Sequence, residues 1–131
     1  MKKQGILNEH INCAVSRLGH TDLLVVADCG LPIPEESFRI DIALVKGIPS
    51  FEDVVVSLAN ELVVARIFVA REMRQMNSSS YRFLVEQFPK IEIVEIPHEE
   101  LKGMLPRAKA IIRTGEATPY ANVILESGVS F

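Results

Sequence analysis

Apolar residues along this chain of 131 residues recur in two ways, at the spacing of a helix face and as short continuous runs. The helical spacing first occurs over residues 11–18, after Asn8, which can cap a helix, and before Gly19, which can end one in a left-handed turn. A continuous apolar run follows at 23–27 between two aspartates, a pattern typical of a strand buried on both faces. The chain is thus predicted to start with a helix and a buried strand.

The two patterns alternate to the C-terminus. Ser50 with Asp53 has the spacing of a capping box, which predicts the start of a second helix. This alternation predicts one α/β domain over residues 1–131, a single layered domain with a largely parallel sheet flanked by helices. Further strands are predicted at 40–45, 63–70, 91–96, 110–112 and 122–125, and helices at 50–62, from one of the serines 78–80 to 88, and between Pro97 and Pro106.

Composition adds an expectation about surfaces and partners. Hydrophobic residues make up 48% of the chain and the mean hydropathy is +0.21, which is high for a chain this short. We therefore expect part of the apolar surface to meet another copy of the chain. The net charge is −3 and the 14 Lys and Arg residues are spread along the whole length, so nucleic acid is not an expected partner.

The apolar stretch near the N-terminus is too short for a signal peptide or a membrane span. The expected location is the cytoplasm, with no membrane contact. Cys13 and Cys29 are then expected to be reduced thiols, and without nearby ligand histidines they do not form a zinc signature.

Polar candidates follow the predicted strands. Asp28 comes after the first strand, His98 after the fourth and residues 114–122 after the fifth, and the carboxyl ends of parallel strands form the edge where α/β sheets bind ligands. Lys102 lies four residues after His98, on the same helical face. These groups are predicted to line one crevice.

His20 does not fit that edge. It precedes the first strand whereas Asp28 ends it, and five or six extended residues span about 17 to 20 Å. Either the chain bends around Asp22, or the site is completed across a subunit boundary. We favour a site shared between subunits.

The motifs that bind phosphates or dinucleotides, GxGxxG and GxxxxGK[ST], are absent, as is the GxSxG elbow of a serine hydrolase. The histidines at 10, 20 and 98 lack zinc-ligand spacing, so no metal site is predicted. Imidazoles, carboxylates, a phenol and an amide remain, and this set suits an uncharged ligand with many hydroxyls, such as a sugar. By residue type alone, His20 and His98 are equally typical of exposed helix ends, and Tyr120 of a packing aromatic.

Two stretches, SRLGHTDLLVVADCGLPIP and TGEATPYANVILESGV, resemble the family of D-ribose pyranases and fucose mutarotases, and the resemblance covers essentially the whole chain. It implies an isomerase that interconverts the β-pyranose and β-furanose forms of D-ribose without a metal or organic cofactor and so feeds ribose catabolism. It also implies a cytoplasmic homo-oligomer built of rings, a homodecamer being one such assembly.

Carried over by position, the resemblance makes His20 the general acid and base and Asp28 its carboxylate partner and a sugar contact. His98, Tyr120 and Asn122 become substrate ligands, and Lys102 is added mainly for its spacing from His98. Opening a cyclic hemiacetal needs a group that donates and accepts protons near neutral pH, and histidine suits this task.

Two other functions stay open at this point. One is a non-enzymatic sugar-binding or regulatory partner of a ribose transporter, which would need the pocket but not the acid and base. The other is a fucose-type mutarotase, which would use the same residues. Ribose is preferred because residues 120–122 resemble the ribose branch of the family.

Overall fold

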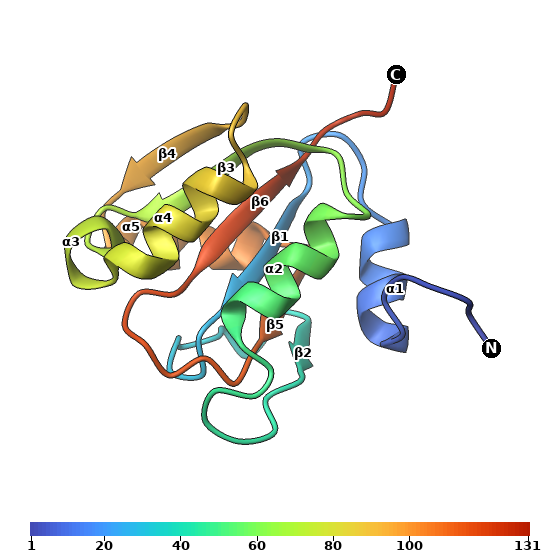
Figure 1. Cartoon of the computed structure of the whole chain (residues 1–131), viewed down its shortest axis with the longest axis horizontal. Helices are drawn as coiled ribbons and strands as arrows, with labels where there is room; N and C mark the ends of the chain where they lie inside the picture. The colour runs from blue at the N-terminus through green and yellow to red at the C-terminus, as the bar shows by residue number, and fades with distance from the viewer.

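A computed structural model describes residues 1–131 as one layered α/β unit (Figure 1). None of its helices is both long and apolar enough to cross a membrane. The elements in chain order are α1 (Glu9–Ser16), β1 (Leu23–Ala27), β2 (Arg39–Asp41), α2 (Phe51–Ala59), β3 (Val64–Ala70), α3 (Met73–Met76), α4 (Ser78–Gln87), β4 (Glu92–Ile96), α5 (His98–Met104), the 3-10 turn η1 (Leu105–Arg107), β5 (Ala110–Arg113) and β6 (Val123–Ser127).

The six strands form one sheet in the order β2-β5-β1-β6-β3-β4. β1, β2 and β5 are parallel to one another, as are β3 and β4, whereas β6 is antiparallel to both of its neighbours, β1 and β3. Five strands therefore share one direction and β6 runs against them inside the sheet. The sheet is mixed, so the prediction of a largely parallel sheet is confirmed in part. The beginning of β6 consequently lies at the same edge as the carboxyl ends of the other five strands.

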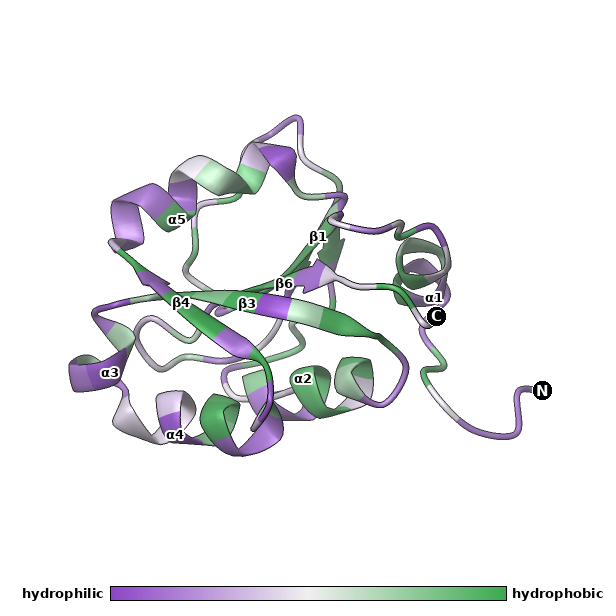
Figure 2. Ribbon diagram, turned by 90° about the horizontal axis from the view of Figure 1, so that it is seen from above, coloured by the Kyte–Doolittle hydropathy of each residue, from purple (hydrophilic) through white to green (hydrophobic).

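Helices cover both faces of the sheet. Seen from above, α2, α3 and α4 lie on one side of the strands and α5 on the other (Figure 2). Residues of β1 divide between two apolar clusters, Leu24 and Val26 packing with α1, α2 and α4, and Leu23, Val25 and Ala27 packing with α5. All five are buried, so the strand predicted to be covered on both faces is confirmed.

Two predicted helix starts are confirmed by their capping contacts. The Asn8 side chain accepts a hydrogen bond from the backbone N–H of Ile11. Ser50 and Asp53 form the predicted capping box, in which each side chain accepts from the other's backbone N–H. α4, in contrast, is capped by Asn77 and not by a serine, because the Asn77 side chain accepts from Ser80 N–H at 3.3 Å.

Two other predictions are wrong in part. The strand predicted at 40–45 ends at Asp41, because the Asp41 carboxylate accepts a hydrogen bond from Ala43 N–H and turns the chain. The left-handed residue after α1 is Thr21, with φ 68°, and not Gly19. The short helix α3 was not predicted, since four residues are too few to show a helical period.

Candidate functional site

The sheet brings four of the predicted site residues to one edge. Asp28 directly follows β1 and His98 begins α5 directly after β4. Tyr120 and Asn122 precede β6, which reaches the same edge because it runs antiparallel to the other strands. The predicted grouping at the carboxyl ends of the strands therefore holds for these four residues.

Asp28 and Asn122 form a closed pair at the centre of this edge. The Asn122 side-chain amide donates to Asp28 Oδ2 at 2.8 Å, and its oxygen accepts from the Asp28 backbone N–H at 2.9 Å. The other oxygen, Oδ1, accepts from Gly30 N–H at 2.9 Å. Asn122 is fully buried and Asp28 half-buried, so a hidden amide fixes the orientation of a carboxylate that reaches the surface.

His98 and Tyr120 form a second pair. Their rings meet edge to face, with centroids 5.1 Å apart and an interplanar angle of 85°. The His98 Nδ1 is buried without a hydrogen-bond partner. Tyr120 has φ 57°, in the left-handed region, and packs against both apolar clusters of the core. The His98 ring thus keeps a hydrogen-bonding capacity that the chain does not use.

Glu72 holds the start of α5 and was not singled out from the sequence. Both of its carboxylate oxygens accept from the His98 backbone N–H, at 3.1 and 3.3 Å. The residue lies just after β3, at the same edge, so it anchors the backbone that carries the His98 ring. Its only signal in the sequence is that position after a strand.

Lys102 lies on α5 and makes its ion pair within that helix. Its Nζ lies 2.6 Å from Glu99 Oε1, and the hydrogen bond from Lys102 holds the pKa of Glu99 below its ordinary value. The Glu99 side chain is 84% exposed, so the pair faces solvent. A sugar contact by Lys102 remains a prediction.

The loop between β5 and β6 lies within the predicted range 114–122, but the sequence predicted no individual role for the polar residues that fix it. Thr114 is buried, and its hydroxyl donates to Ala27 O at 2.8 Å while accepting from Glu116 N–H. The Glu116 carboxylate accepts from the backbone N–H groups of Phe51, Ala117 and Thr118. A threonine and a glutamate close together after a buried strand were the available signal.

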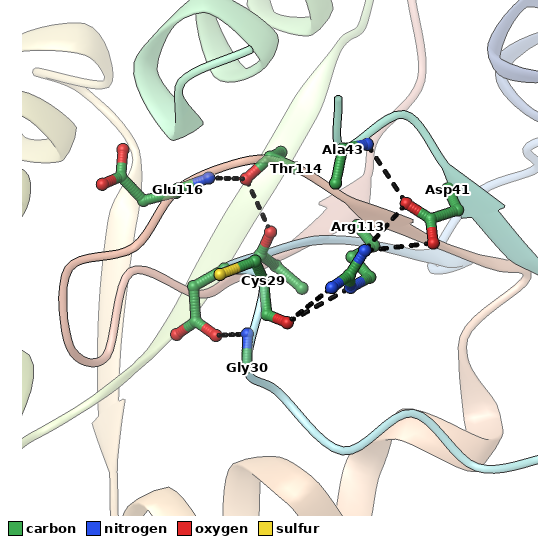
Figure 3. A network of polar contacts seen from close by, with 9 residues as sticks. Cys29, Gly30, Asp41, Ala43, Arg113, Thr114 and Glu116 are labelled. Carbon is green, nitrogen blue, oxygen red and sulfur yellow. Dashed lines mark hydrogen bonds and ion pairs between the residues drawn. The ribbon is translucent and has the colours of Figure 1, made fainter. Parts of the chain in front are cut away.

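Arg113, at the end of β5, joins the segment after β1 to the edge strand β2. Its guanidinium donates to Cys29 O at 3.0 and 3.2 Å and to both Asp41 oxygens at 3.1 and 3.2 Å. Figure 3 shows these contacts beside those of Thr114 and Gly30. The segment after β1 is therefore tied to β2 on one side and, through Asp28, to β6 on the other.

A surface depression of about 440 Å³ opens beside Asp28. Its lining includes Asp28, Lys46, Glu116 and Thr118. It does not include His98, Lys102, Tyr120 or Asn122, so this depression is not the single crevice that was predicted for all of these groups. The volume is in the range of small-molecule sites, roughly 300 to 1,000 Å³. A larger depression of about 610 Å³ lies between the N-terminal segment and α2 and contains none of the predicted site residues.

The structure does not bring His20 to this edge. It is exposed in the turn before β1, so it lies at the opposite end of that strand from Asp28. The chain does turn at Asp22, but the turn leaves His20 beside the C-terminal end of β6, where Thr21 N–H donates to Ser127 O. Within one chain the predicted acid and base and its carboxylate are separated.

The sequence model of the RbsD / FucU transport protein family matches residues 1–130. The chain belongs to this family. It is 53% identical to the D-ribose pyranase of Geobacillus thermodenitrificans over 131 residues, which are 100% of this chain and 99% of the relative. It is 55% identical to the D-ribose pyranase of a Thermoanaerobacter species over 100% of both chains.

Solved structures of the RbsD / FucU family share the fold. Bacillus subtilis RbsD complexed with D-ribose matches with a TM-score of 0.97 at 46% identity over 100% of both chains. The fucose mutarotase of Streptococcus pneumoniae, solved in complex with L-fucose, matches with a TM-score of 0.79 at 21% identity over 95% of both chains, a likeness of fold alone. The RbsD / FucU architecture is thus retained while most residues change.

Proposed function

We propose that this chain is an isomerase that interconverts the β-pyranose and β-furanose forms of D-ribose. The supporting observation is full-length identity of 53% and 55% to two D-ribose pyranases. The likeness to Bacillus subtilis RbsD complexed with D-ribose, with a TM-score of 0.97 at 46% identity, supports D-ribose as the ligand. The fucose mutarotase is far more distant at 21% identity, which favours ribose over fucose.

The reaction needs only proton transfers. A base takes the proton of the anomeric hydroxyl, the bond from C1 to the ring oxygen breaks, and an acid protonates that oxygen to give the open-chain aldehyde. The C4 hydroxyl then attacks C1 and loses its proton, while the carbonyl oxygen gains one, so the ring closes with one atom fewer. No electrons are transferred, and positioned acid–base catalysis typically accelerates such steps about 10² to 10⁴-fold.

Asp28 is suited to orient the groups that move these protons. Each carboxylate oxygen accepts one hydrogen bond from the chain, Oδ1 from Gly30 and Oδ2 from Asn122. A carboxylate has about four acceptor positions, so capacity remains for a sugar hydroxyl and for an imidazole N–H. We assign Asp28 to both contacts and give Asn122 the additional task of fixing Asp28.

His98 and Tyr120 are the proposed ligands of the sugar hydroxyls. The unpaired Nδ1 of His98 and the edge-to-face contact of the two rings support this assignment. Lys102 and Asn122 complete the proposed set of substrate ligands. Lys102 is the weakest member because its ammonium group already pairs with Glu99.

His20 of a second copy is the proposed acid and base. Within one chain His20 and Asp28 lie at opposite ends of β1, so a site that contains both needs two copies. A hairpin beside the Asp28 depression exposes Leu44, Val45 and Ile48 by 77%, 58% and 56%, and such apolar exposure favours contact with another chain. We propose a homo-oligomer of rings, with a decamer as the expected size, acting in the cytoplasm.

Exchange NMR on D-ribose with the purified protein tests the activity directly. The unaltered protein should broaden or transfer saturation between the pyranose and furanose signals, and His20→Ala should reduce this exchange about 10² to 10⁴-fold. His10→Ala, which removes an exposed imidazole from α1, is the matched control and should exchange ribose normally. Ribose binding without any exchange would identify a binding protein, and exchange of fucose anomers alone would identify a mutarotase.

Mixing two inactive variants tests the shared site. His20→Ala and Asp28→Asn proteins should each be inactive, but after joint unfolding and refolding about one quarter of the sites should pair an intact His20 with an intact Asp28 from different copies. Recovery of roughly that fraction of exchange supports the proposal. If the mixture stays inactive although the copies associate, both residues act within one chain and the shared site is wrong.

A further inference from the structure

Only two residues other than glycine have a positive φ, and both adjoin β6. Tyr120, at 57°, precedes the strand, and Thr21, at 68°, contacts its last residue. A β-branched residue in the left-handed region is an outlier, because its side chain crowds the backbone there. Such backbone strain persists only where surrounding contacts enforce it, and an observed outlier is a starting point for a functional hypothesis.

The contacts that enforce it at Thr21 are complete. Thr21 N–H donates to Ser127 O at 2.9 Å, and Ser127 N–H donates to Asp22 O at 2.8 Å. Within the turn, Asp22 N–H donates to Gly19 O at 3.1 Å, and the Asp22 carboxylate accepts from Gly19 N–H at 2.8 Å. The backbone on both sides of His20 is thus bonded to itself and to the end of β6.

Asp22 also connects the turn to the beginning of β5. Its Oδ1 lies 3.7 Å from Lys109 Nζ, and Lys109 N–H donates to Leu23 O at 2.8 Å. His20 is the one residue between Gly19 and Asp22 that makes no hydrogen bond within the chain, and it is exposed. The exposed His20 side chain is therefore carried by a turn in which Gly19, Thr21 and Asp22 are all hydrogen-bonded.

We propose that residues 19–22 form a rigid mount for His20, and that Thr21 and Asp22 are positioning residues for the reaction. This inference rests on the proposed function, in which His20 enters the site of another copy. Proton transfer requires the imidazole within hydrogen-bond reach of the sugar, and a flexible turn would have to be ordered at each encounter. Glycine would relieve the strain at position 21, whereas threonine restricts the chain to fewer conformations.

Three variants distinguish a role of Asp22 in positioning His20 from a role in the stability of the fold. Asp22→Ala removes the acceptor for Gly19 N–H, Asp22→Asn keeps an acceptor oxygen of the same shape, and Glu36→Ala removes an exposed carboxylate with no bonded partner as the matched control. Hydrogen–deuterium exchange of the intact assembly, read by mass spectrometry over residues 17–24, reports whether the turn is held. Exchange NMR on ribose gives kcat and KM for the same proteins.

The expected result for Asp22→Ala is faster exchange of the bonded amides of residues 19, 21 and 22 and a kcat lowered about tenfold or more. KM should stay within about twofold, because binding is kept and orientation is lost. Asp22→Asn should recover at least roughly a third of the native kcat, since its oxygen can still accept from Gly19. A purely structural residue would instead lower the melting temperature and change kcat and KM together.

Three outcomes decide the matter. If Asp22→Ala keeps kcat within about threefold of the Glu36→Ala control while His20→Ala is inactive, the mount is wrong and the proposed function stands. If His20→Ala keeps its exchange activity, the proposed role of His20 fails, and the mount with it. Should Asp22→Ala not fold, the unaltered protein still decides, because amides 19, 21 and 22 exchanging as fast as the C-terminal tail would overturn the inference.

Discussion

The two ends of β6 differ in how much of the neighbouring site residue the chain itself buries and bonds. At its beginning, Asn122 is fully buried and bonded twice to Asp28, and the preceding loop is held by buried or half-buried side chains. At its end, Ser127 exchanges backbone hydrogen bonds with residues 21 and 22, and the neighbouring His20 remains exposed. Both ends carry a residue of positive φ, but only at the first is the neighbouring site residue, Asp28, held by hydrogen bonds within the chain.

This difference shows which half of the site a single chain can complete. A carboxylate can be oriented by an amide that lies beside it in the same sheet, so Asp28 is fixed within one chain. The exposed imidazole of His20 has no hydrogen-bond partner in its own chain, so it can take part in a site only when a second copy binds next to it. The first end should therefore respond to substitution through both stability and activity, and the second mainly through activity.

The largest effect is expected from Asn122→Asp, which disrupts the hydrogen-bonded pair of Asp28 and Asn122 at the beginning of β6. The new carboxylate would face Asp28 in a buried position, and an uncompensated buried charge costs about 3 to 5 kcal/mol of unfolding free energy at neutral pH. Ribose exchange should fall together with the stability, because Asp28 loses the hydrogen bond that the Asn122 amide donates. Chemical denaturation and exchange NMR measure both.

The stability that Asn122→Asp loses should increase with pH. Two facing carboxylates retain a shared proton, so their folded pKa lies above the unfolded value. The lost stability should be small below the unfolded pKa and should develop as pH rises through the folded one. Asn60→Asp, at an exposed position, is the control, and an equal loss of stability in both variants would contradict the prediction.

Gly115→Ala should produce the next largest effect, by separating the loop from the exposed hairpin. A Cβ at this position would overlap the carbonyl oxygens of Val45 and Ile48, which are backbone atoms and cannot move aside cheaply. The expected loss is about 2 to 4 kcal/mol of unfolding free energy, measured by denaturation. Gly103→Ala on α5 has open space for its Cβ and should be neutral or slightly stabilising.

Local patterns predicted the scaffold because each is enforced by nearby residues. The Ser50 capping box and the buried strand at 23–27 depend on a few consecutive positions, and both are confirmed. The placement of β6 between β1 and β3 depends on pairings between distant segments, which periodicity does not encode. The sequence could therefore place Asp28 at the end of a strand but could not place Asn122 beside it.

The same limit applies to the site. Asp28, His98, Tyr120 and Asn122 were predicted because each adjoins a strand and matches a family pattern, and the fold brings them to one edge. The roles of Glu72 and Thr114 depend on backbone groups of other segments, with no local signature. The turn at His20 was expected at Gly19, because glycine is the usual left-handed residue, and the strained Thr21 took that place.

A smaller effect is expected from Leu44→Ser, which tests whether the two ends meet between copies. Leu44 is 77% exposed in one chain, and burying a leucine contributes about 1.5 to 3 kcal/mol, so association should weaken roughly tenfold or more while the fold is unchanged. Sedimentation at several concentrations measures this, and exchange should fall in parallel. Leu7→Ser, at a residue 74% exposed in the N-terminal segment, is the control, and equal association for both variants would contradict the prediction.

The smallest effect is expected from Lys102→Met, which tests whether Lys102 is a substrate ligand at the sheet edge that contains Asp28. The hydrogen bond from Lys102 lowers the folded pKa of Glu99, so its contribution is present above the unfolded pKa and is lost as pH falls through the folded one. Without Lys102 the Glu99 pKa should return upward, as a carboxyl NMR titration would show, with little change in stability because the pair faces solvent. Lys90→Met, at an exposed lysine without a bonded partner, is the control. A raised KM for ribose would support Lys102 as a sugar ligand, and an unchanged KM would leave it only as the partner of Glu99.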